Sequence, residues 1–158
     1  MNIFNASLGS GKNYVKPILS LPIVNGDFNG ANIDFWDTQN LSVAFEIYDG
    51  ENAVKLESTG AYSLLKQSVA TTIGGKYKVT ALMNDVNIGG EVGLVVYDTD
   101  LQTTTVGSAQ DPLILNAHTL NASPDWQVAE VIFTATSNMC TVCCRELSNN
   151  FFYLNEVI

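Results

Sequence analysis

The last residues of the chain, FFYLNEVI (151–158), decide the fold. Phe152 and Leu154 alternate with Phe151 and Tyr153, which is the period of two that places successive side chains on opposite faces of a β-strand. Large apolar side chains continue almost to the final residue, although chain ends are usually polar and mobile. The stretch therefore predicts a buried final strand.

The same period recurs along most of the chain. In VAFEIY (43–48), Val43, Phe45 and Ile47 share one face. The dipeptide Asp49-Gly50 follows, and both residues tolerate a positive φ, so it predicts a tight hairpin turn. Further alternating stretches predict strands at 53–58, 76–84, 91–98, 126–135 and 140–146.

Two regions carry weaker patterns. AYSLLKQSVA (61–70) would suit a short helix, but its Ser and Val residues and the Gly-Gly pair that follows favour a strand. Residues 98–125 are polar, rich in Thr and interrupted by Pro112 and Pro124, so we expect one short strand, PLILNAH (112–118), between two long loops. Many short strands without a helical period predict an all-β protein, an antiparallel β-sandwich of the jelly-roll type.

Residues 1–20 are rich in Asn, Ser and Gly and precede the first expected strand, LPIV (21–24). We therefore divide the chain into an extended N-terminal arm, residues 1–20, and a β-sandwich domain, residues 21–158. Ordering an arm costs about 1–2 kcal/mol per residue in backbone entropy, so extensive contacts would have to hold it. Two interpretations stay open. The arm either folds back over a sheet edge of its own sandwich, or anchors the domain to an assembly through Ile3, Phe4, Leu8 and Tyr14.

The chain is strongly acidic, with 7 Lys and Arg residues against 16 Asp and Glu residues and a net charge of -9 at pH 7. Such a surface repels phosphate, so it argues against nucleic-acid binding and against sulfated or sialylated glycans. MNIFNASLGSGKNYVK (1–16) has no long apolar core and no small-residue cleavage site, so we expect no signal peptide. No apolar run is long enough to span a bilayer, so we expect no membrane insertion.

A family pattern is carried by several motifs taken together: IVNGDFN (23–29), Trp36, AVKLES (53–58), LLKQSVATTIGGKYKVTA (64–81), Trp126 with VIFTA (131–135), and FFYLNEV (151–157). Their order resembles the jelly-roll carbohydrate-binding modules of the family 4/9/22 type, over residues 21–158. The resemblance implies a galactose-binding-domain-like β-sandwich in which the last strand runs beside the first and closes one sheet. It also implies that both tryptophans pack in the core.

The resemblance further implies a structural calcium where the final strand meets the start of the domain. The matching positions are Asn29 and Asn155, which are amides here, with Asp27 close by in sequence. Calcium prefers several carboxylates, so we expect weak or no calcium binding unless Asp27, Glu57 or Glu156 compensates. We expect no other cofactor.

In the family, the ligand cleft lies on the concave sheet, where aromatic rings stack on sugars and amides bind hydroxyl groups. The candidate ligand-binding residues here are Tyr62, Gln67, Asn84 and Tyr97. The strand KYKVTALMN (76–84) presents no tryptophan, so the platform is thin. Tyrosines that only pack or decorate the surface are an equally good interpretation. A bound glycan would be neutral, given the acidic surface.

Other residues give little support for catalysis or metal binding. CTVCC (140–144) alternates as a strand, so its thiols lack the helix N-terminus of a redox pair, and we expect small buried cysteines with Cys140 and Cys144 on one face. Zinc would need four ligands, and His118 lies far away in sequence. Asp98 and Asp100 are most simply turn residues. We therefore predict that the protein is not an enzyme.

Two functions remain open. The first is a structural or decoration protein of a larger assembly, specifically a phage virion, which docks through residues 1–20, is oligomeric in that assembly and binds host-surface glycans with a lectin-like jelly roll. The expected lack of a signal peptide favours this first function and a location in the virion. The second is a carbohydrate-binding module of a secreted, extracellular polysaccharide-degrading enzyme. The fold alone does not decide between them.

Overall fold

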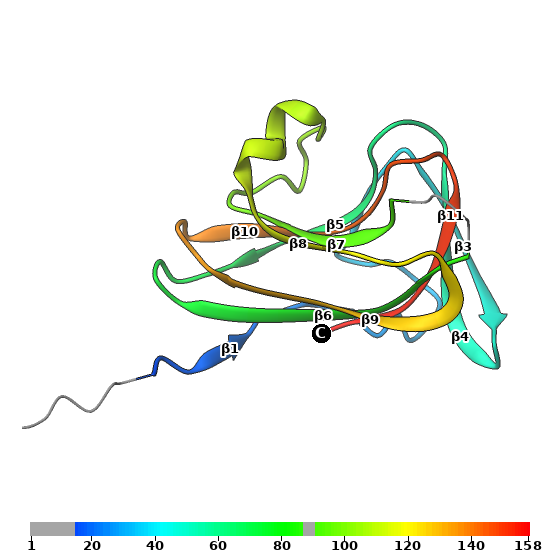
Figure 1. The fold of residues 1–158 in the computed structure, drawn as a ribbon, viewed down its shortest axis with the longest axis horizontal. Coiled ribbons are helices and arrows are strands. Elements are labelled where there is room, and N and C mark those ends of the chain that lie inside the picture. Colours follow the sequence, from blue (N-terminus) through cyan, green and yellow to red (C-terminus); the bar gives the residue numbers. More distant parts are fainter. Residues whose placement is uncertain (1–14, 87–90) are drawn as a thin grey trace, which may run out of the picture.

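Alternating apolar and polar side chains form strands along most of residues 15–86 and 91–158, the ranges that the computed structural model describes (Figure 1). The predicted anchor residues Ile3, Phe4, Leu8 and Tyr14 lie outside these ranges. No helix within them is long and apolar enough to cross a bilayer. The elements, in chain order, are β1 (Ile18–Ser20), β2 (Asp37–Gln39), β3 (Leu41–Tyr48), β4 (Glu51–Ser58), β5 (Ser63–Ala70), β6 (Lys76–Asp85), β7 (Gly93–Tyr97), the 3-10 helix η1 (Ser108–Leu113), β8 (Ile114–Thr119), β9 (Ser123–Thr134), β10 (Met139–Glu146) and β11 (Phe151–Val157).

Two sheets pack face to face, as expected for an all-β sandwich of the jelly-roll class. Among the described residues, sheet A has the order β1-β6-β11-β4-β3, with β9 also paired to β6. Sheet B has the order β2-β5-β10-β7-β8. The strand predicted at 61–70 is confirmed as β5, and the strand in PLILNAH as β8.

The final strand β11 lies in the middle of sheet A. It is antiparallel to β4 on one side and to β6 on the other. The expectation that the last strand runs beside the first is wrong. β9 pairs with one edge of β6, and β1 and β11 pair with the other edge, β1 with residues 76–78 and β11 with residues 81–84. The last strand does reach the start of the domain, since the Val157 N–H donates to the Gly26 carbonyl at 2.7 Å.

The N-terminal segment differs from the prediction. LPIV (21–24) forms no strand, because Pro22 lacks an N–H and Asn25, with φ 51°, turns the chain immediately afterwards. Residues 18–20 instead form β1, which pairs with β6 in parallel. This part of the predicted arm lies on the domain's own sandwich, as the alternative interpretation of the arm expects.

The second long loop predicted within residues 98–125 is also wrong. β9 begins at Ser123, so only residues 120–122 separate it from β8. Pro124 lies inside β9, where its missing N–H is tolerated because β6 is the one strand that pairs with β9 among the described residues.

The hairpin of β3 and β4 has the predicted turn. Asp49 has φ 52° and Gly50 has φ 82°, so both central residues take the positive φ that a tight two-residue turn needs. Tyr48 pairs with Glu51 across the turn.

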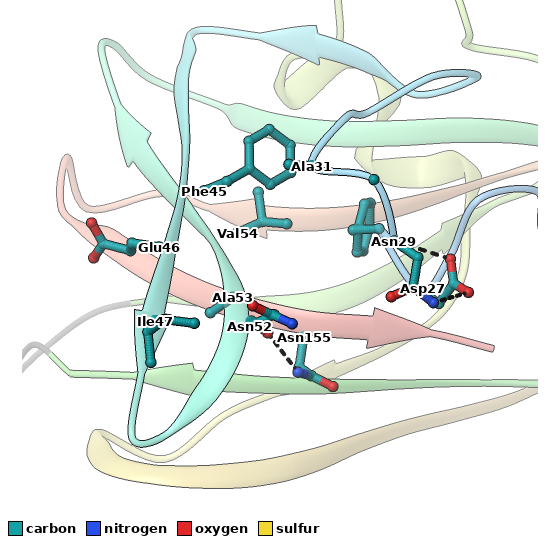
Figure 2. Close-up of a pocket in the computed structure, with 12 residues that line it drawn as sticks. Asp27, Asn29, Ala31, Phe45, Glu46, Ile47, Asn52, Ala53, Val54 and Asn155 are labelled. Carbon is teal, nitrogen blue, oxygen red and sulfur yellow. Dashed lines mark hydrogen bonds between the residues drawn. The ribbon is translucent and has the colours of Figure 1, made fainter.

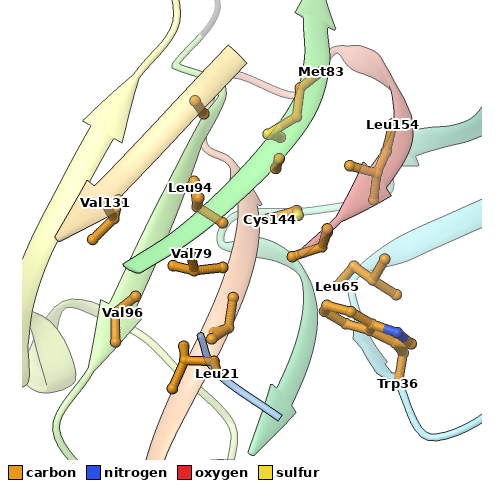
Figure 3. Close-up of a cluster of buried hydrophobic side chains, with 14 of the residues drawn as sticks. Leu21, Trp36, Leu65, Val79, Met83, Leu94, Val96, Val131, Cys144 and Leu154 are labelled. Carbon is orange, nitrogen blue, oxygen red and sulfur yellow. The ribbon is translucent and has the colours of Figure 1, made fainter. Parts of the chain in front are cut away.

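The main core lies between the sheets (Figure 3). Val79, Met83, Leu94 and Cys144 are fully buried there. Trp36 is also buried, as predicted, and its indole N–H donates to the Asn25 carbonyl at 3.1 Å.

Trp126 is not in this core, contrary to the prediction. Ala129 and Val131 of the same strand point inward, so Trp126 faces the outer side of sheet A. Its ring meets Tyr48 edge to face, with centroids 5.7 Å apart. Tyr153 and Phe151 continue the contacts. We call Tyr48, Trp126, Phe151 and Tyr153 the aromatic cluster.

Candidate functional site

The structure does not bring the four predicted sugar-binding residues together. Tyr62, Gln67 and Tyr97 lie in or next to strands of sheet B, whereas Asn84 lies on β6 of sheet A. Asn84 and Tyr97 are fully buried and Gln67 is almost so. Only Tyr62 is half-exposed, and its hydroxyl donates to the Asp111 carboxylate at 3.0 Å.

The buried members already have protein partners. Gln67 exchanges two hydrogen bonds of 2.8 Å with the Val24 backbone. Asn84 accepts a hydrogen bond from the Tyr153 N–H at 3.2 Å. Tyr97 accepts one from Arg145 at 3.2 Å, and burial raises the pKa of its phenol. In this conformation Asn84 and Tyr97 offer no exposed surface to a sugar, and Gln67 is only 3% exposed.

The outer face of sheet B is covered by the chain itself. The segment 98–113, with η1 at its end, lies over β5, β7 and β10 (Figure 1). Its Leu101 and Val106 pack against Leu64, Val95 and Tyr97 in a second apolar cluster. A stacking platform on this face is therefore closed to a ligand.

Lys66 of β5 holds this segment in place. Its side chain is buried, and its ammonium donates to the carbonyls of Leu101 at 2.8 Å and Thr104 at 2.5 Å. The Asp37 carboxylate lies 3.6 Å away and balances the charge. A buried cation with these partners favours the closed position of the segment, since opening would break both of its hydrogen bonds to the segment.

A groove of about 450 Å³ opens elsewhere, between the β3–β4 hairpin and the loop 27–31 (Figure 2). We call it the hairpin groove. It is lined by Asp27, Phe28, Asn29, Gly30, Ala31, Phe45, Glu46, Ile47, Asn52, Ala53, Val54 and Asn155.

The floor of the hairpin groove is apolar. Phe45 and Ile47 belong to the inward face that the alternation predicts, yet they are 38% and 66% exposed. Leu41 and Val43, earlier in β3, pack against the core, so the strand leaves the shelter of the sandwich part-way along its length. Buried Val54 completes the floor.

The rim of the groove carries amides and the carboxylates of Asp27 and Glu46. Asn155 donates to the backbone carbonyl of Asn52 at 2.7 Å. Asn29 donates to Asp27 through its side chain at 2.7 Å and through its backbone N–H at 3.3 Å. Figure 2 shows the first pair on β4 and β11 and the second in the loop 27–31. Fixed planar amides beside an apolar floor match the mixed polar and apolar surface of a sugar.

The three residues predicted for calcium, Asp27, Asn29 and Asn155, all border this groove. They do not fit a calcium ion well, because Asp27 is their one carboxylate and Asn29 occupies both of its oxygens. Neither Glu57 nor Glu156, the suggested compensating acids, lines the groove. In the described part of the chain, no group of three or more His, Cys, Asp or Glu side chains could hold a metal.

The cysteines have the predicted arrangement. Cys140, Cys143 and Cys144 are free and buried. Cys140 and Cys144 belong to the main core, and Cys143 faces the opposite side. Asp98 accepts hydrogen bonds from Thr136 and Ser137, which ties it to the turn that precedes β10.

Sequence reasoning missed the floor of the groove. Ile47 and Asn52 are paired across the hairpin, so their proximity could have been read from the Asp49-Gly50 turn. Their exposure could not, because it depends on where sheet B ends.

Comparison with known proteins gives a clear result for the fold. No family model matches the chain, and no curated protein matches it. A solved family 4 carbohydrate-binding module is similar over 86% of this chain and 97% of its own, with 17% identity and a TM-score of 0.59. The fold is that of a carbohydrate-binding module.

Two further structures with this module fold are informative. A family 61 carbohydrate-binding module, solved in complex with beta-1,4-galactotriose, matches 87% of this chain and 95% of its own, with 14% identity and a TM-score of 0.55. The enzymatically active domain of bacteriophage CBA120 tailspike protein 4 matches 87% of this chain, with 12% identity and a TM-score of 0.62. The match covers 21% of that tailspike chain.

Proposed function

We propose that the protein is a non-catalytic glycan-binding domain whose hairpin groove holds a neutral sugar. The observation that carries the proposal is the exposed apolar floor of Phe45 and Ile47 beside the amides of Asn52 and Asn155. An apolar floor takes the C–H face of a pyranose ring, and amides bind its hydroxyl groups. The bound beta-1,4-galactotriose of the family 61 module supports a neutral oligosaccharide as the ligand class.

The charge of the site supports a neutral ligand. The described residues that line the groove include Asp27 and Glu46 and no Lys or Arg. A uronic acid or a sulfated sugar would meet uncompensated negative charge there, in addition to the net charge of -9.

The test is affinity electrophoresis in gels that contain soluble neutral polysaccharides, namely xylan, mixed-linkage β-glucan and β-galactan. We expect retention of the wild-type protein on at least one of them. Ile47→Ala and Asn155→Ala should each weaken that retention, because the first removes floor and the second removes a rim amide. Ile73→Ala is the matched control, since Ile73 is 61% exposed and lies in the turn before β6. Equal retention of all four proteins would place the site outside the hairpin groove.

We further propose that this domain works within a larger assembly, a phage virion, and that residues 1–20 dock it there. The similarity to a module of a xylanase is compatible with the alternative, a module of a secreted polysaccharide-degrading enzyme. The similarity to part of a tailspike is compatible with the virion assignment. Host-surface glycans would then be the ligands and the virion the location.

The assembly proposal has its own test. Deletion of residues 1–14 leaves β1 and the core intact, so the shortened domain should keep its melting temperature and its glycan retention. It should lose co-sedimentation with the particle. A shortened domain that still sediments with the particle would refute docking through the arm. If neither the full-length nor the shortened protein sediments with the particle, the result favours the secreted module.

A further inference from the structure

Phe35 lies on the surface in a conformation that a bulky side chain rarely adopts. Its φ is 71°, in the left-handed region, where the Cβ crowds the backbone. Its side chain is 70% exposed, so packing within the chain does not offset that strain.

Phe28, in the same loop, makes the contrast clear. It also has a left-handed φ, of 50°, but its side chain is buried and its ring lies 5.7 Å from that of Trp36. Core packing therefore compensates for the strain at Phe28. At Phe35 the same backbone conformation holds the ring out into solvent.

Hydrogen bonds on both sides keep Phe35 in this conformation. Its carbonyl accepts from the Gln67 side chain at 3.4 Å. The next residue, Trp36, donates its N–H to the Ile33 carbonyl at 2.9 Å and its indole N–H to Asn25. The loop cannot relax at Phe35 without disturbing the buried Trp36. Strain held by the surrounding structure is characteristic of binding sites.

An open hollow lies beside the ring. It measures about 490 Å³ and is separate from the hairpin groove, with which it shares no lining residue. Its lining combines apolar Pro22, Val24 and Met139 with polar Gln67, Ser68, Asp100 and Gln102.

Hydrogen bonds to the backbone hold the polar side chains of the hollow in place. The Gln102 side chain accepts from the Ser68 N–H at 2.6 Å, and Asp100 accepts from the Gln102 N–H at 3.0 Å. Hydrogen bonds from Ser68 and from the Gln102 backbone lower the pKa of the Asp100 carboxyl, which keeps it ionised. An exposed carboxylate of this kind accepts hydrogen bonds from hydroxyl groups and repels acidic ligands.

We propose that Phe35 and this hollow form a second saccharide site, which takes a neutral pyranose unit. The ring of Phe35 stacks on the C–H face of the sugar, while Asp100 and Gln102 bind its hydroxyl groups. Asp100 keeps acceptor capacity beyond its bond from the Gln102 N–H, and hydroxyl groups can donate to it. A sugar combines such hydroxyl groups with an apolar C–H face that suits the ring, so it uses both sides of the hollow.

The test combines stability with binding, because the proposal predicts opposite signs for the two. Asn tolerates a left-handed φ, so Phe35→Asn should raise the urea unfolding midpoint. The same variant should weaken binding to the hollow about fivefold to tenfold, the scale of one lost ring contact. Phe35→Tyr keeps the ring and should bind like the wild type. The readout is retention on xylan, mixed-linkage β-glucan and β-galactan.

The hairpin-groove variant Ile47→Ala separates the two proposals. If Phe35→Asn reduces retention and Ile47→Ala does not, the hollow is a sugar site and the hairpin groove fails. If only Ile47→Ala reduces retention, the hairpin groove stands and the Phe35 site is refuted. A lower unfolding midpoint for Phe35→Asn would give the ring a packing role and also refute the site, as would the absence of retention for the wild-type protein.

Discussion

The ring of Tyr48 stacks on the ring of Tyr153, with centroids 4.0 Å apart and planes inclined by 21°. Tyr48 ends β3 and Tyr153 lies on the central strand β11, so the stack joins the tip of the hairpin to the middle of sheet A. The Tyr48 hydroxyl also donates to the Pro124 carbonyl at 3.0 Å, which ties the tip to β9. These contacts hold the hairpin through the outer face of sheet A, and its inner face, with Phe45 and Ile47, remains open as the floor of the groove.

Removing the Tyr48 ring should therefore loosen the hairpin. Tyr48→Ala loses two ring contacts and a hydrogen bond, and we expect it to lower the free energy of unfolding by about 2 kcal/mol. It should also weaken retention through the hairpin groove, although Tyr48 does not line it. Urea unfolding and affinity electrophoresis measure the two effects. Tyr48→Phe keeps the stacked ring, so it should lose only a fraction of the stability and of the retention that Tyr48→Ala loses. Full stability of Tyr48→Ala would contradict the joining role.

The Tyr153 hydroxyl should make stability depend on pH at the alkaline end. Burial, and then its 2.5 Å hydrogen bond to Glu46, raise the pKa of Tyr153 to about 12. A folded pKa above the unfolded value of about 10 means that this contribution is complete below about pH 10 and is lost as the pH rises through about 12. In Tyr153→Phe, the free energy of unfolding should thus fall less steeply between about pH 10 and pH 12. Parallel slopes for the two proteins would contradict the assignment.

Gly26 should be intolerant of any side chain. A Cβ at this position would lie 2.0 Å from the Val157 carbonyl oxygen, which is backbone of the final strand and cannot move aside. We expect Gly26→Ala to destabilise the fold by about 3 kcal/mol. Gly107→Ala is the control, since its nearest neighbour would be 4.0 Å away. Thermal unfolding compares them, and similar melting temperatures would show that the end of β11 is not held against Gly26.

Calcium should not stabilise the protein. Asp27 is the one carboxylate among the three predicted ligands, and its oxygens already bind Asn29. A tightly held ion would raise the melting temperature by mass action. We therefore expect the same melting temperature in EDTA and in millimolar calcium, measured by differential scanning fluorimetry. Asn155→Asp adds a second carboxylate and is the variant in which a calcium response should first become visible.

The cysteines should be inert in the folded protein. Burial raises the pKa of Cys140 and Cys143 to about 12, and that of Cys144 even further. Only the thiolate reacts, so a disulfide reagent added at neutral pH should label none of the three until denaturant is added. Rapid labelling of Cys143 in the native protein would show that Lys66 does not hold the covering segment closed, because Cys143 faces that segment.

The sequence alone was sufficient to predict the local structure of the β3–β4 hairpin. The alternation in VAFEIY and the Asp49-Gly50 dipeptide specify β3, its turn and β4, because both signals act between neighbouring residues. The free, buried cysteines also followed from the alternation of CTVCC. The sequence likewise placed Asp27, Asn29 and Asn155 together at one site, through the family resemblance, and they do border one groove.

Tertiary structure decided what each strand faces. Tyr97 alternates as a surface residue of sheet B would, but the segment 98–113 folds over it, held by the buried Lys66. Trp126 is a large apolar residue of the kind that usually packs in a core. It lies on the outer face of sheet A because of its position along β9. The period of two assigns a residue to one of two faces, whereas the covering of that face depends on segments distant in sequence. For this reason the sequence determined most of the strands and the β3–β4 turn of this protein, and only the packing of its sheets, hairpin and loops determined where a ligand can enter.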